Sequence, residues 1–419
     1  MVGDPALSAS RTAPLRFNLN SFLLALSTML DFVESDLLGV ASNHGRRVAY
    51  ITARLIERAG LSDAEIFDAV ALALLHDNGL TEALLTSSAL PVNVERMRHA
   101  ENLTAHCEIG EHNLAAFPFL TEVRGAIKHH HEQYDGQGFF GLAGEDIPLA
   151  ARIIGFADYV DLLFDFSTPD QANREKIADA VAGMRSQAFS PRNCDLFDEI
   201  AAKPAFWLDL QDDFIDQALK ERVPDIWQEL SWDRILEISR VFSRIVDCKS
   251  QFTQRHSSGL EEKAARMAEF YQFDHETNIK VRIAASLHDI GKLAIPNSIL
   301  DKPDRLTPFE FRKMQEHTYY TRRCLERIEG FADITEWAAN HHERLDGSGY
   351  PLGLTAGRLD FNSRLMACLD IYQALTEERP YRRSLPHREA MAILRPQAED
   401  GLLEKGIVAD LDQVFAPPA

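Results

Sequence analysis

Seven potential metal-binding side chains occur twice in this chain at an almost constant offset. The offset is 212 residues for the first His, the His-Asp pair and the final Asp, and 211 residues for the three His between them. A repeat of this length indicates a duplicated domain, because solenoid units span only about 20–50 residues. The first set is His44, His76, Asp77, His106, His130, His131 and Asp158, and the second is His256, His288, Asp289, His317, His341, His342 and Asp370.

The length of 419 residues therefore divides into two domains, each large enough to bury its own core. A polar run over 211–222, followed by Pro224, suggests a boundary that gives domains 1–222 and 223–419. Helical patterning continues through this region, so a continuous helical connector and a flexible one both stay open.

Apolar residues recur at three- and four-residue spacings through most of the sequence, which is typical of helices. Segments 20–40 and 232–248 have this pattern, and each leads to the first His of its repeat. Further helices are expected over 48–59 and 262–271, each followed by an Ala-rich helix that ends in His-Asp. We expect an all-α fold of two tandem helical bundles, each with a metal site in its core.

The composition of the ligand set indicates its chemistry. We expect one helix over 283–292, ended by Gly291, that presents His288 and Asp289 to a common centre, and another helix that carries His341-His342. Five His and two Asp are too many for one tetrahedral zinc, and they suit two ions of iron or manganese. A carboxylate can bridge two such ions, which together activate water and stabilise the oxygens of a phosphodiester. The pattern therefore predicts a metal-dependent hydrolase.

The alternative is that these are core histidines satisfied by hydrogen bonds. For one isolated His that interpretation would be preferred, but seven ligands repeated in order make it negligible. Five further His show no such pattern, and we assign no role to His99, His112, His129, His275 and His387.

The overall composition limits the partners and the compartment. The chain has 64 acidic and 44 basic residues, a net charge of −20, so its average surface repels duplex nucleic acid. A small anionic substrate stays compatible if metal ions and a few cations reverse the field locally. Five scattered cysteines indicate reduced, buried thiols, and the apolar stretch 22–30 is too short to span a bilayer. We expect a cytoplasmic protein without a membrane partner.

Two motifs in the second half resemble the HD-GYP family, the bacterial cyclic di-GMP phosphodiesterases of the HD hydrolase superfamily. They are His288-Asp-Ile-Gly-Lys292 and His341-His-Glu-Arg-Leu-Asp-Gly-Ser-Gly-Tyr-Pro351, and the resemblance covers about residues 230–410. It implies a helical bundle around two or three ions of iron or manganese. The implied first-metal ligands are His256, His288 and Asp370, the second-metal ligands are His317, His341 and His342, and Asp289 bridges the two ions as a catalytic residue.

The same resemblance implies a substrate site. Lys292 matches a catalytic lysine that contacts the scissile phosphate, and Tyr350 matches a residue that lines the pocket. Arg344, Arg379 and Arg382 are assigned to substrate binding as well. Structural alternatives stay open for four of them. Lys292 could complement the end of a helix, Arg379 and Arg382 could pair with Glu377 and Glu378 on the surface, and Tyr350 could belong to a rigid turn.

Two positions depart from the family pattern. The three-metal members of the family carry Glu four residues before the first His, where this chain has Phe252, so we expect two ions. The family usually has Asp where this chain has Gln373, and the consequence of that change stays open.

The first copy keeps all its metal ligands but not the matching substrate residues. Leu80 replaces the lysine, Gly138-Phe139-Phe140 replaces Gly-Tyr-Pro, and no counterpart of Arg379 or Arg382 follows Asp158. We expect this half to hold metal, to lack cations for a cyclic dinucleotide, and to serve as a structural or regulatory partner.

These observations predict hydrolysis of a cyclic dinucleotide to a linear one, with cyclic di-GMP preferred over 3',3'-cyclic GMP–AMP as the substrate. Further hydrolysis to a mononucleotide stays open. A receptor that binds without turnover and an HD-type hydrolase of mononucleotides are the alternatives. An exposed apolar helix between the halves would allow a homodimer, although no specific motif indicates one.

Overall fold

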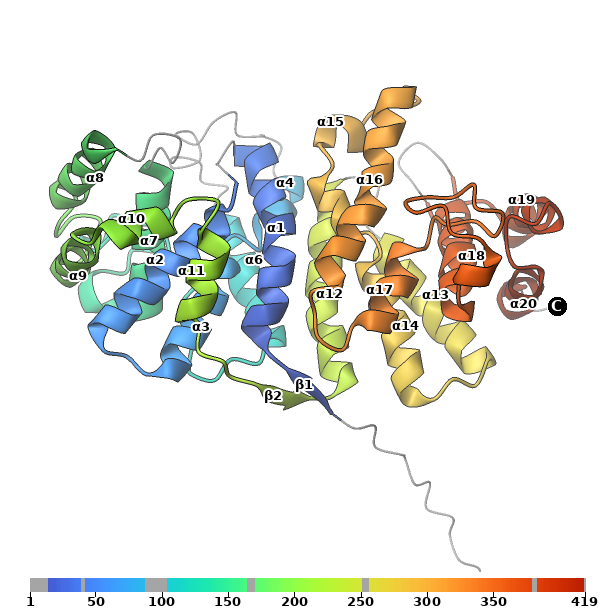
Figure 1. Cartoon of the computed structure of the whole chain (residues 1–419), viewed down its shortest axis with the longest axis horizontal. Coiled ribbons are helices and arrows are strands. Elements are labelled where there is room, and N and C mark those ends of the chain that lie inside the picture. Colours follow the sequence, from blue (N-terminus) through green and yellow to red (C-terminus); the bar gives the residue numbers. More distant parts are fainter. Residues whose placement is uncertain are drawn as a thin grey trace, which may run out of the picture.

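The protein consists of two helical halves that lie side by side (Figure 1). The structure, a computed structural model, describes residues 14–38, 42–86, 104–163, 170–250, 256–378 and 383–417. The predicted all-α class is confirmed. The helices of the first half are α1 (Leu19–Leu38), α2 (His44–Ala59), α3 (Asp63–Leu74), α4 (Leu80–Thr86), α6 (Thr104–Asn113), α7 (Leu149–Leu163), α8 (Gln171–Gly183), α9 (Pro191–Ala201), α10 (Pro204–Asp209) and α11 (Ile215–Arg222).

The second half repeats the order of the helices that carry the ligands. Helix α13 begins at His256 as α2 begins at His44, and α18 begins at Phe361 as α7 begins at Leu149. The helices of this half are α12 (Trp232–Lys249), α13 (His256–Phe270), α14 (His275–Leu287), α15 (Asn297–Leu300), α16 (Pro308–Leu325), α17 (Ala332–Ala339), α18 (Phe361–Thr376), α19 (His387–Glu399) and α20 (Lys405–Phe415).

Capping residues set the starts of two helices that position the sites. Ser62 and Glu65 form a reciprocal capping box at the start of α3, which leads to the first His-Asp pair. Thr307 and Glu310 do the same for α16, where Pro308 occupies the first helical position. Both boxes satisfy backbone N–H groups that a helix start otherwise leaves unpaired.

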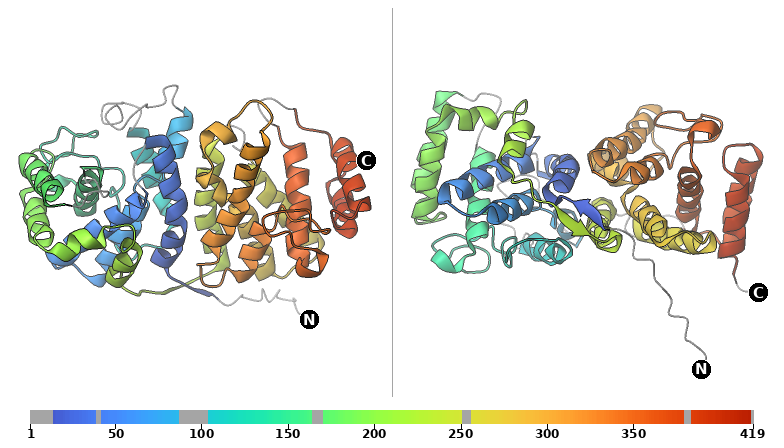
Figure 2. Two further views of the ribbon diagram at one scale, coloured as in Figure 1. Left: turned by 45° about the horizontal axis from the view of Figure 1, so that its top comes forward. Right: turned by 60° about the horizontal axis from the view of Figure 1, so that its bottom comes forward.

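Helices α1 and α12 lie at the boundary between the two halves (Figures 1 and 2). Their buried apolar residues belong to one hydrophobic core that continues through both halves. The ring of Phe22 on α1 lies 5.7 Å from that of Phe242 on α12 and 6.0 Å from that of Phe331. The thiol of Cys324 on α16 donates a hydrogen bond to the carbonyl of Ala25 on α1. The apolar faces of these boundary helices are therefore buried, and they do not provide the exposed helix expected for dimerisation.

The connector between the halves is neither a continuous helix nor a free linker. Helix α11 ends at Arg222, and strand β2 (Gln228–Leu230) pairs antiparallel with β1 (Leu15–Phe17). The N-terminal strand is thus tied to the segment that enters α12. The division into domains at residue 222 stays a prediction, because α1 packs against both halves.

Two simpler expectations concern hydrophobic helices and thiols. Among the described residues, no helix is long and apolar enough to cross a membrane. All five cysteines are free, and four are buried as predicted. Cys248 is only partly buried, so the prediction was wrong for that residue.

Candidate active site

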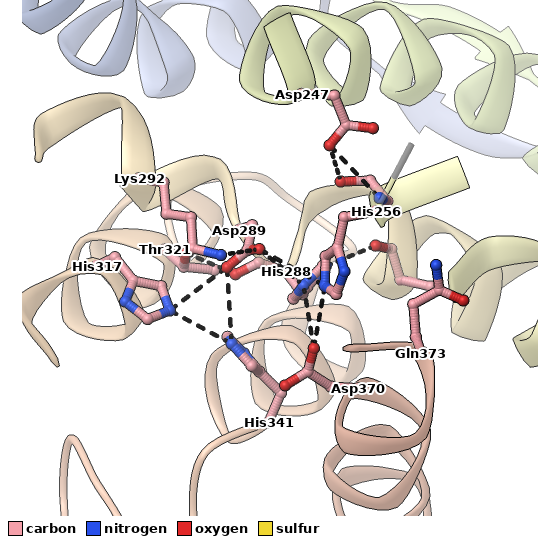
Figure 3. Close-up of polar contacts among 12 residues, drawn as sticks. Asp247, His256, His288, Asp289, Lys292, His317, Thr321, His341, Asp370 and Gln373 are labelled. Atoms are coloured by element: carbon pink, nitrogen blue, oxygen red, sulfur yellow. Dashed lines mark hydrogen bonds and ion pairs between the residues drawn. The ribbon is translucent and has the colours of Figure 1, made fainter. Parts of the chain in front are cut away.

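The seven predicted ligands of the second half converge in its interior, and Figure 3 labels all of them except His342. They come from the start of α13, the turn after α14, the middle of α16, the turn after α17 and the middle of α18. In that order the residues are His256, His288 with Asp289, His317, His341 with His342, and Asp370. Segments up to 114 residues apart are brought together, as the ion pair between His256 and Asp370 illustrates.

The predicted helix through Lys292 was wrong in detail. Helix α14 ends at Leu287, so His288-Asp289 lie in the turn before the 3-10 helix η4 (Ile290–Ala294), and His341-His342 likewise follow the end of α17. Gly291 lies inside η4 and does not end a helix. A Cβ at Gly291 would lie 2.0 Å from the carbonyl oxygen of His317, so glycine permits η4 to approach α16 closely.

The carboxylate of Asp289 lies between two groups of imidazoles. Its Oδ2 is 3.0 Å from Nε2 of His288 and 3.9 Å from Nε2 of His256. Its Oδ1 is 3.4 Å from Nε2 of His317 and 3.8 Å from Nε2 of His341. Burial opposes ionisation, but the neighbouring charges of His288 and Lys292 lower the pKa of Asp289 well below its usual value. One oxygen of the ionised carboxylate therefore faces each of the two groups of imidazoles.

These groups coincide with the two ligand sets that the family resemblance implies. Ligand atoms within each set lie within 4.8 Å of one another, a spacing at which a single cation can contact all three. One set is His256, His288 and Asp370, and the other is His317, His341 and His342. The roles of these residues as ligands stay a prediction.

Hydrogen bonds orient the imidazoles toward the centre. Nδ1 of His288 donates to the carbonyl of Ala285 at 2.8 Å, and His317 and His341 make the same bond to the residue three positions earlier at 2.6 Å. This arrangement leaves each Nε2 available as an acceptor, as metal-binding His requires. Burial lowers the pKa of His317 to about 3 and that of His342 to about 4, so both are neutral at physiological pH.

The cage fits divalent cations because it contains buried polar atoms that need partners. Oδ1 of Asp289 is buried and makes no hydrogen bond within the described residues, and the buried Nε2 of His288 faces the carboxylates of Asp289 and Asp370. An unsatisfied buried polar group costs about 1–3 kcal/mol, and a coordinated cation would remove this cost. The mixed nitrogen and oxygen donors suit a transition metal.

Three residues that were predicted to contact the substrate lie beside the cage within the described part of the chain. Nζ of Lys292 forms an ion pair with Oδ2 of Asp289. The ring of Tyr350 lies 4.8 Å from that of His342, and Arg344, which is half-buried, interacts electrostatically with the tyrosine. Arg379 and Arg382 lie outside the described residues, as does Phe252.

The loop that carries Tyr350 is held by a buried carboxylate. Oε1 of Glu343 accepts the backbone N–H of Leu352 at 2.7 Å, and Oε2 accepts that of Leu354 at 2.8 Å. A Cβ at Gly349 would lie 2.4 Å from the backbone nitrogen of Arg344, so only glycine allows the loop to fold back this tightly. The loop thereby holds the Tyr350 ring against the cage.

Sequence reasoning missed Glu377 as a member of the site. It was considered only as a surface partner for the nearby arginines, yet its Oε2 accepts a hydrogen bond from Nδ1 of His256 at 2.8 Å. The signal that could have indicated this role is Gln373, one helical turn earlier, where the family usually has Asp.

The first half assembles the equivalent cage. Oδ1 of Asp77 is 3.4 Å from Nε2 of His106, and its Oδ2 is 3.7 Å from Nε2 of His76. The buried Nε2 atoms of His76 and His130 make no hydrogen bond within the described part of the chain. The two candidate groups are His44, His76 and Asp158, and His106, Cys107, His130 and His131.

A cavity of about 320 Å³ opens onto this first cage. Its walls are largely apolar and include Leu80, Phe139 and Tyr159. Arg152 also lines the cavity, although it is paired with Glu145 at 2.7 Å. Arg152 comes from α7 and not from the loops that were compared, and the expectation that this half lacks cations for a cyclic dinucleotide stays a prediction.

The fold and the sites define an all-helical protein with a duplicated cage of candidate divalent-metal ligands. The sequence profile of the HD domain family matches residues 32–192 and 240–403, and the chain belongs to this family. Within it, the chain belongs to the HD-GYP group of cyclic-dinucleotide phosphodiesterases, which confirms the resemblance inferred from the motifs.

Relatives differ in how much of the chain they match. The 3'3'-cGAMP-specific phosphodiesterase 1 of Vibrio cholerae is 31% identical over 93% of this chain and 90% of its own length. A cyclic di-GMP phosphodiesterase of Thermotoga maritima is 35% identical over 38% of this chain and 44% of its own length. The crystal structure of the cyclic GMP-AMP-specific phosphodiesterase V-cGAP3 of V. cholerae has a TM-score of 0.68 and 25% identity, and covers 96% of this chain and 99% of its own.

Proposed function

We propose that this protein is a metal-dependent phosphodiesterase that hydrolyses a cyclic dinucleotide in its second half. The observation that carries the proposal is the position of Asp289, whose two oxygens face two separate groups of imidazoles beside Lys292. Such a cage suits a pair of ions. Relatives of the chain are named as phosphodiesterases of small cyclic dinucleotides. The first product is the linear dinucleotide.

We assign His256, His288 and Asp370 to one ion and His317, His341 and His342 to the other, with Asp289 between them. Iron or manganese fits this donor set, and Phe252 in place of a glutamate favours two ions over three. When bound, such ions supply activation of water and neutralisation of phosphate charge.

The side chains of the protein then orient the substrate. Lys292 projects from η4 toward the cage, where its ammonium group can share charge with Asp289 and contact the scissile phosphate. Tyr350 provides an aromatic face above His342 against which a base can stack. Arg344, Arg379 and Arg382 supply cations that hold the two phosphates and the purines in register with the cage.

We favour 3',3'-cyclic GMP–AMP as the preferred substrate, with cyclic di-GMP second. This reverses the order that the motifs alone suggested. A relative that matches 93% of the chain is named for cyclic GMP–AMP, whereas the cyclic di-GMP enzyme from T. maritima matches 38% of it. The C-terminal motifs do not distinguish the two substrates.

The test uses the full chain loaded with Mn²⁺ or Fe²⁺ and incubated separately with each cyclic dinucleotide, with products separated by chromatography. We expect linear dinucleotide in both reactions, formed faster from cyclic GMP–AMP, and no product from Asp289→Asn. Binding without product under either metal would identify a receptor instead. Faster hydrolysis of mononucleotides would identify a different HD-type hydrolase.

We propose that the first half binds metal and supports the second half without turning over the dinucleotide. Its complete cage supports metal binding, and Leu80 and Phe139 at the cavity argue against a phosphate site. Asp77→Asn should lower the metal content of the full chain while the second half still produces linear dinucleotide. Equal loss of turnover in Asp77→Asn and Asp289→Asn would contradict this division of roles.

A further inference from the structure

The first ligand His of each copy is held by a carboxylate, but the carboxylate comes from a different position. In the first half, Nδ1 of His44 donates to Oδ2 of Asp161 at 2.6 Å. Asp161 in turn accepts from Arg47, through Nε at 2.6 Å and Nη2 at 3.2 Å. The side chains of Asp161 and Arg47 are only 3% and 1% exposed, so this ion pair is part of the buried structure.

The second half has lost both members of that ion pair. At the 212-residue offset, Asp161 corresponds to Gln373 and Arg47 corresponds to Gly259. The two replacements fit each other, because a Cβ at Gly259 would lie 2.3 Å from the amide nitrogen of Gln373. The glutamine therefore occupies space that a side chain at residue 259 would need.

A second acid and a second cation lie four residues further along the chain, the acid directly after the end of α18 and the cation on α13. Glu377 follows Gln373 by four residues, its side chain is 7% exposed, and its Oε2 accepts from Nδ1 of His256 at 2.8 Å. Lys263 follows Gly259 by four residues, and its Nζ donates to Oε1 of Gln373 at 2.5 Å. Nε2 of Gln373 completes the chain by donating to Oε2 of Glu377 at 3.4 Å.

We propose that Glu377 is the positioning residue of the second-half centre and has taken over the role that Asp161 has in the first half. Its hydrogen bond fixes the ring of His256 so that Nε2 faces Oδ1 of Asp370 at 3.0 Å. Gln373 acts as a neutral bridge that holds Glu377 in place and links it to Lys263. This inference rests on the proposed metal-binding function of the cage.

The relocation also accounts for the departure of Gln373 from the family pattern. A glutamine cannot supply the negative charge that strengthens a metal-binding imidazole, whereas a carboxylate on the outer ring nitrogen does. With Glu377 in that position, the loss of the acid at residue 373 is compensated. The centre is therefore complete despite the substitution.

The test compares Glu377→Gln with the double variant Glu377→Gln/Gln373→Asp in the full chain. All proteins also carry Asp77→Asn, so that the measurement reports on the second-half cage. Free Mn²⁺ is followed by electron paramagnetic resonance during titration of the metal-free protein, and circular dichroism checks the fold. Glu262→Gln, an exposed substitution on α13, is the matched control.

We expect Glu377→Gln to weaken Mn²⁺ binding by about 10- to 100-fold, the usual effect of removing such a partner, and Glu262→Gln to have no effect. The carboxylate that Gln373→Asp adds should recover at least about tenfold of the loss, since the equivalent acid holds His44 in the first half. Unchanged affinity in Glu377→Gln, or a loss that the second substitution does not recover, would overturn the assignment. If the parent protein itself neither binds Mn²⁺ nor produces linear dinucleotide, the proposed function fails instead.

Discussion

Replacing Lys292 with Met tests whether this residue contacts the substrate or only supports the cage. Its side chain is 19% exposed, it projects from η4, and its Nζ is paired with Oδ2 of Asp289. Methionine keeps an unbranched apolar side chain and removes the ammonium group, with its charge and its hydrogen-bond donors. The backbone N–H of Lys292, which donates to the carbonyl of Asp289 at 2.8 Å, is unaffected.

The expected loss follows from one charged hydrogen bond to a phosphate oxygen. Such a bond contributes about 1.5–3 kcal/mol. Since each 1.36 kcal/mol corresponds to a factor of ten, kcat/KM should fall by about 10- to 150-fold. The cage keeps all its ligand atoms in this variant, so the metal content should stay at the level of the unmodified protein.

The assay measures initial rates of linear dinucleotide formation at saturating Mn²⁺, together with metal content by mass spectrometry. Lys280→Met is the control, because Lys280 lies in the middle of α14 and pairs with Glu276 and Asp333, neither of which belongs to the cage. If kcat/KM of Lys292→Met falls by less than about threefold while the metal content is unchanged, the phosphate contact is refuted. A fall that tracks loss of metal would show that Lys292 acts through Asp289.

Three further predictions concern the cage, its protons and the core. Asp289→Asn should lose at least one equivalent of Mn²⁺ and at least about 100-fold in turnover, because an amide nitrogen is not a cation ligand; retained metal, measured by mass spectrometry, would contradict this. Burial lowers the pKa of His256, but its hydrogen bonds to Asp370 and Glu377 outweigh burial and raise the pKa to about 9. Metal binding at pH 7.5 should therefore release about one proton from His256, and affinity should rise with pH up to about 9. Calorimetry in buffers of different ionisation enthalpy measures this release, and none would be seen if His256 were already neutral. Phe22→Ala should lower the free energy of unfolding by about 3–5 kcal/mol in urea titration, and a change below about 1 kcal/mol would show that α1 does not join the two cores.

The repeat made the ligand set predictable, because the same residue types recur at matching positions of the two copies. Offsets of 212 and 211 residues select the same seven positions in both halves, and the structure brings each set together. The apolar spacing likewise predicted helices such as α12, expected over 232–248 and observed over Trp232–Lys249. Both signals are local or repeated in the sequence.

Features that depend on contacts between distant segments were not predictable. Gly291 was interpreted as a helix end, whereas its role is to let η4 approach the carbonyl of His317, 26 residues later. Glu377 was regarded as a surface acid because its partner, His256, precedes it by 121 residues. The sequence next to these residues does not indicate either contact, and only the departure of Gln373 from the family pattern draws attention to the region of Glu377.

The differences between the copies reveal which parts of the cage are exchangeable. The seven ligand positions are identical in type in both halves, but the outer carboxylate and its cation are not: Asp161 with Arg47 in one half, Glu377 with Lys263 through Gln373 in the other. An outer partner needs only to place an oxygen against one ring nitrogen, so it can come from a neighbouring helical turn. A ligand must reach a fixed point shared with several other side chains, and no neighbouring position satisfies that requirement. The first half keeps every candidate ligand while the residues matched to a substrate site have changed, which is the pattern expected if metal binding there is still required.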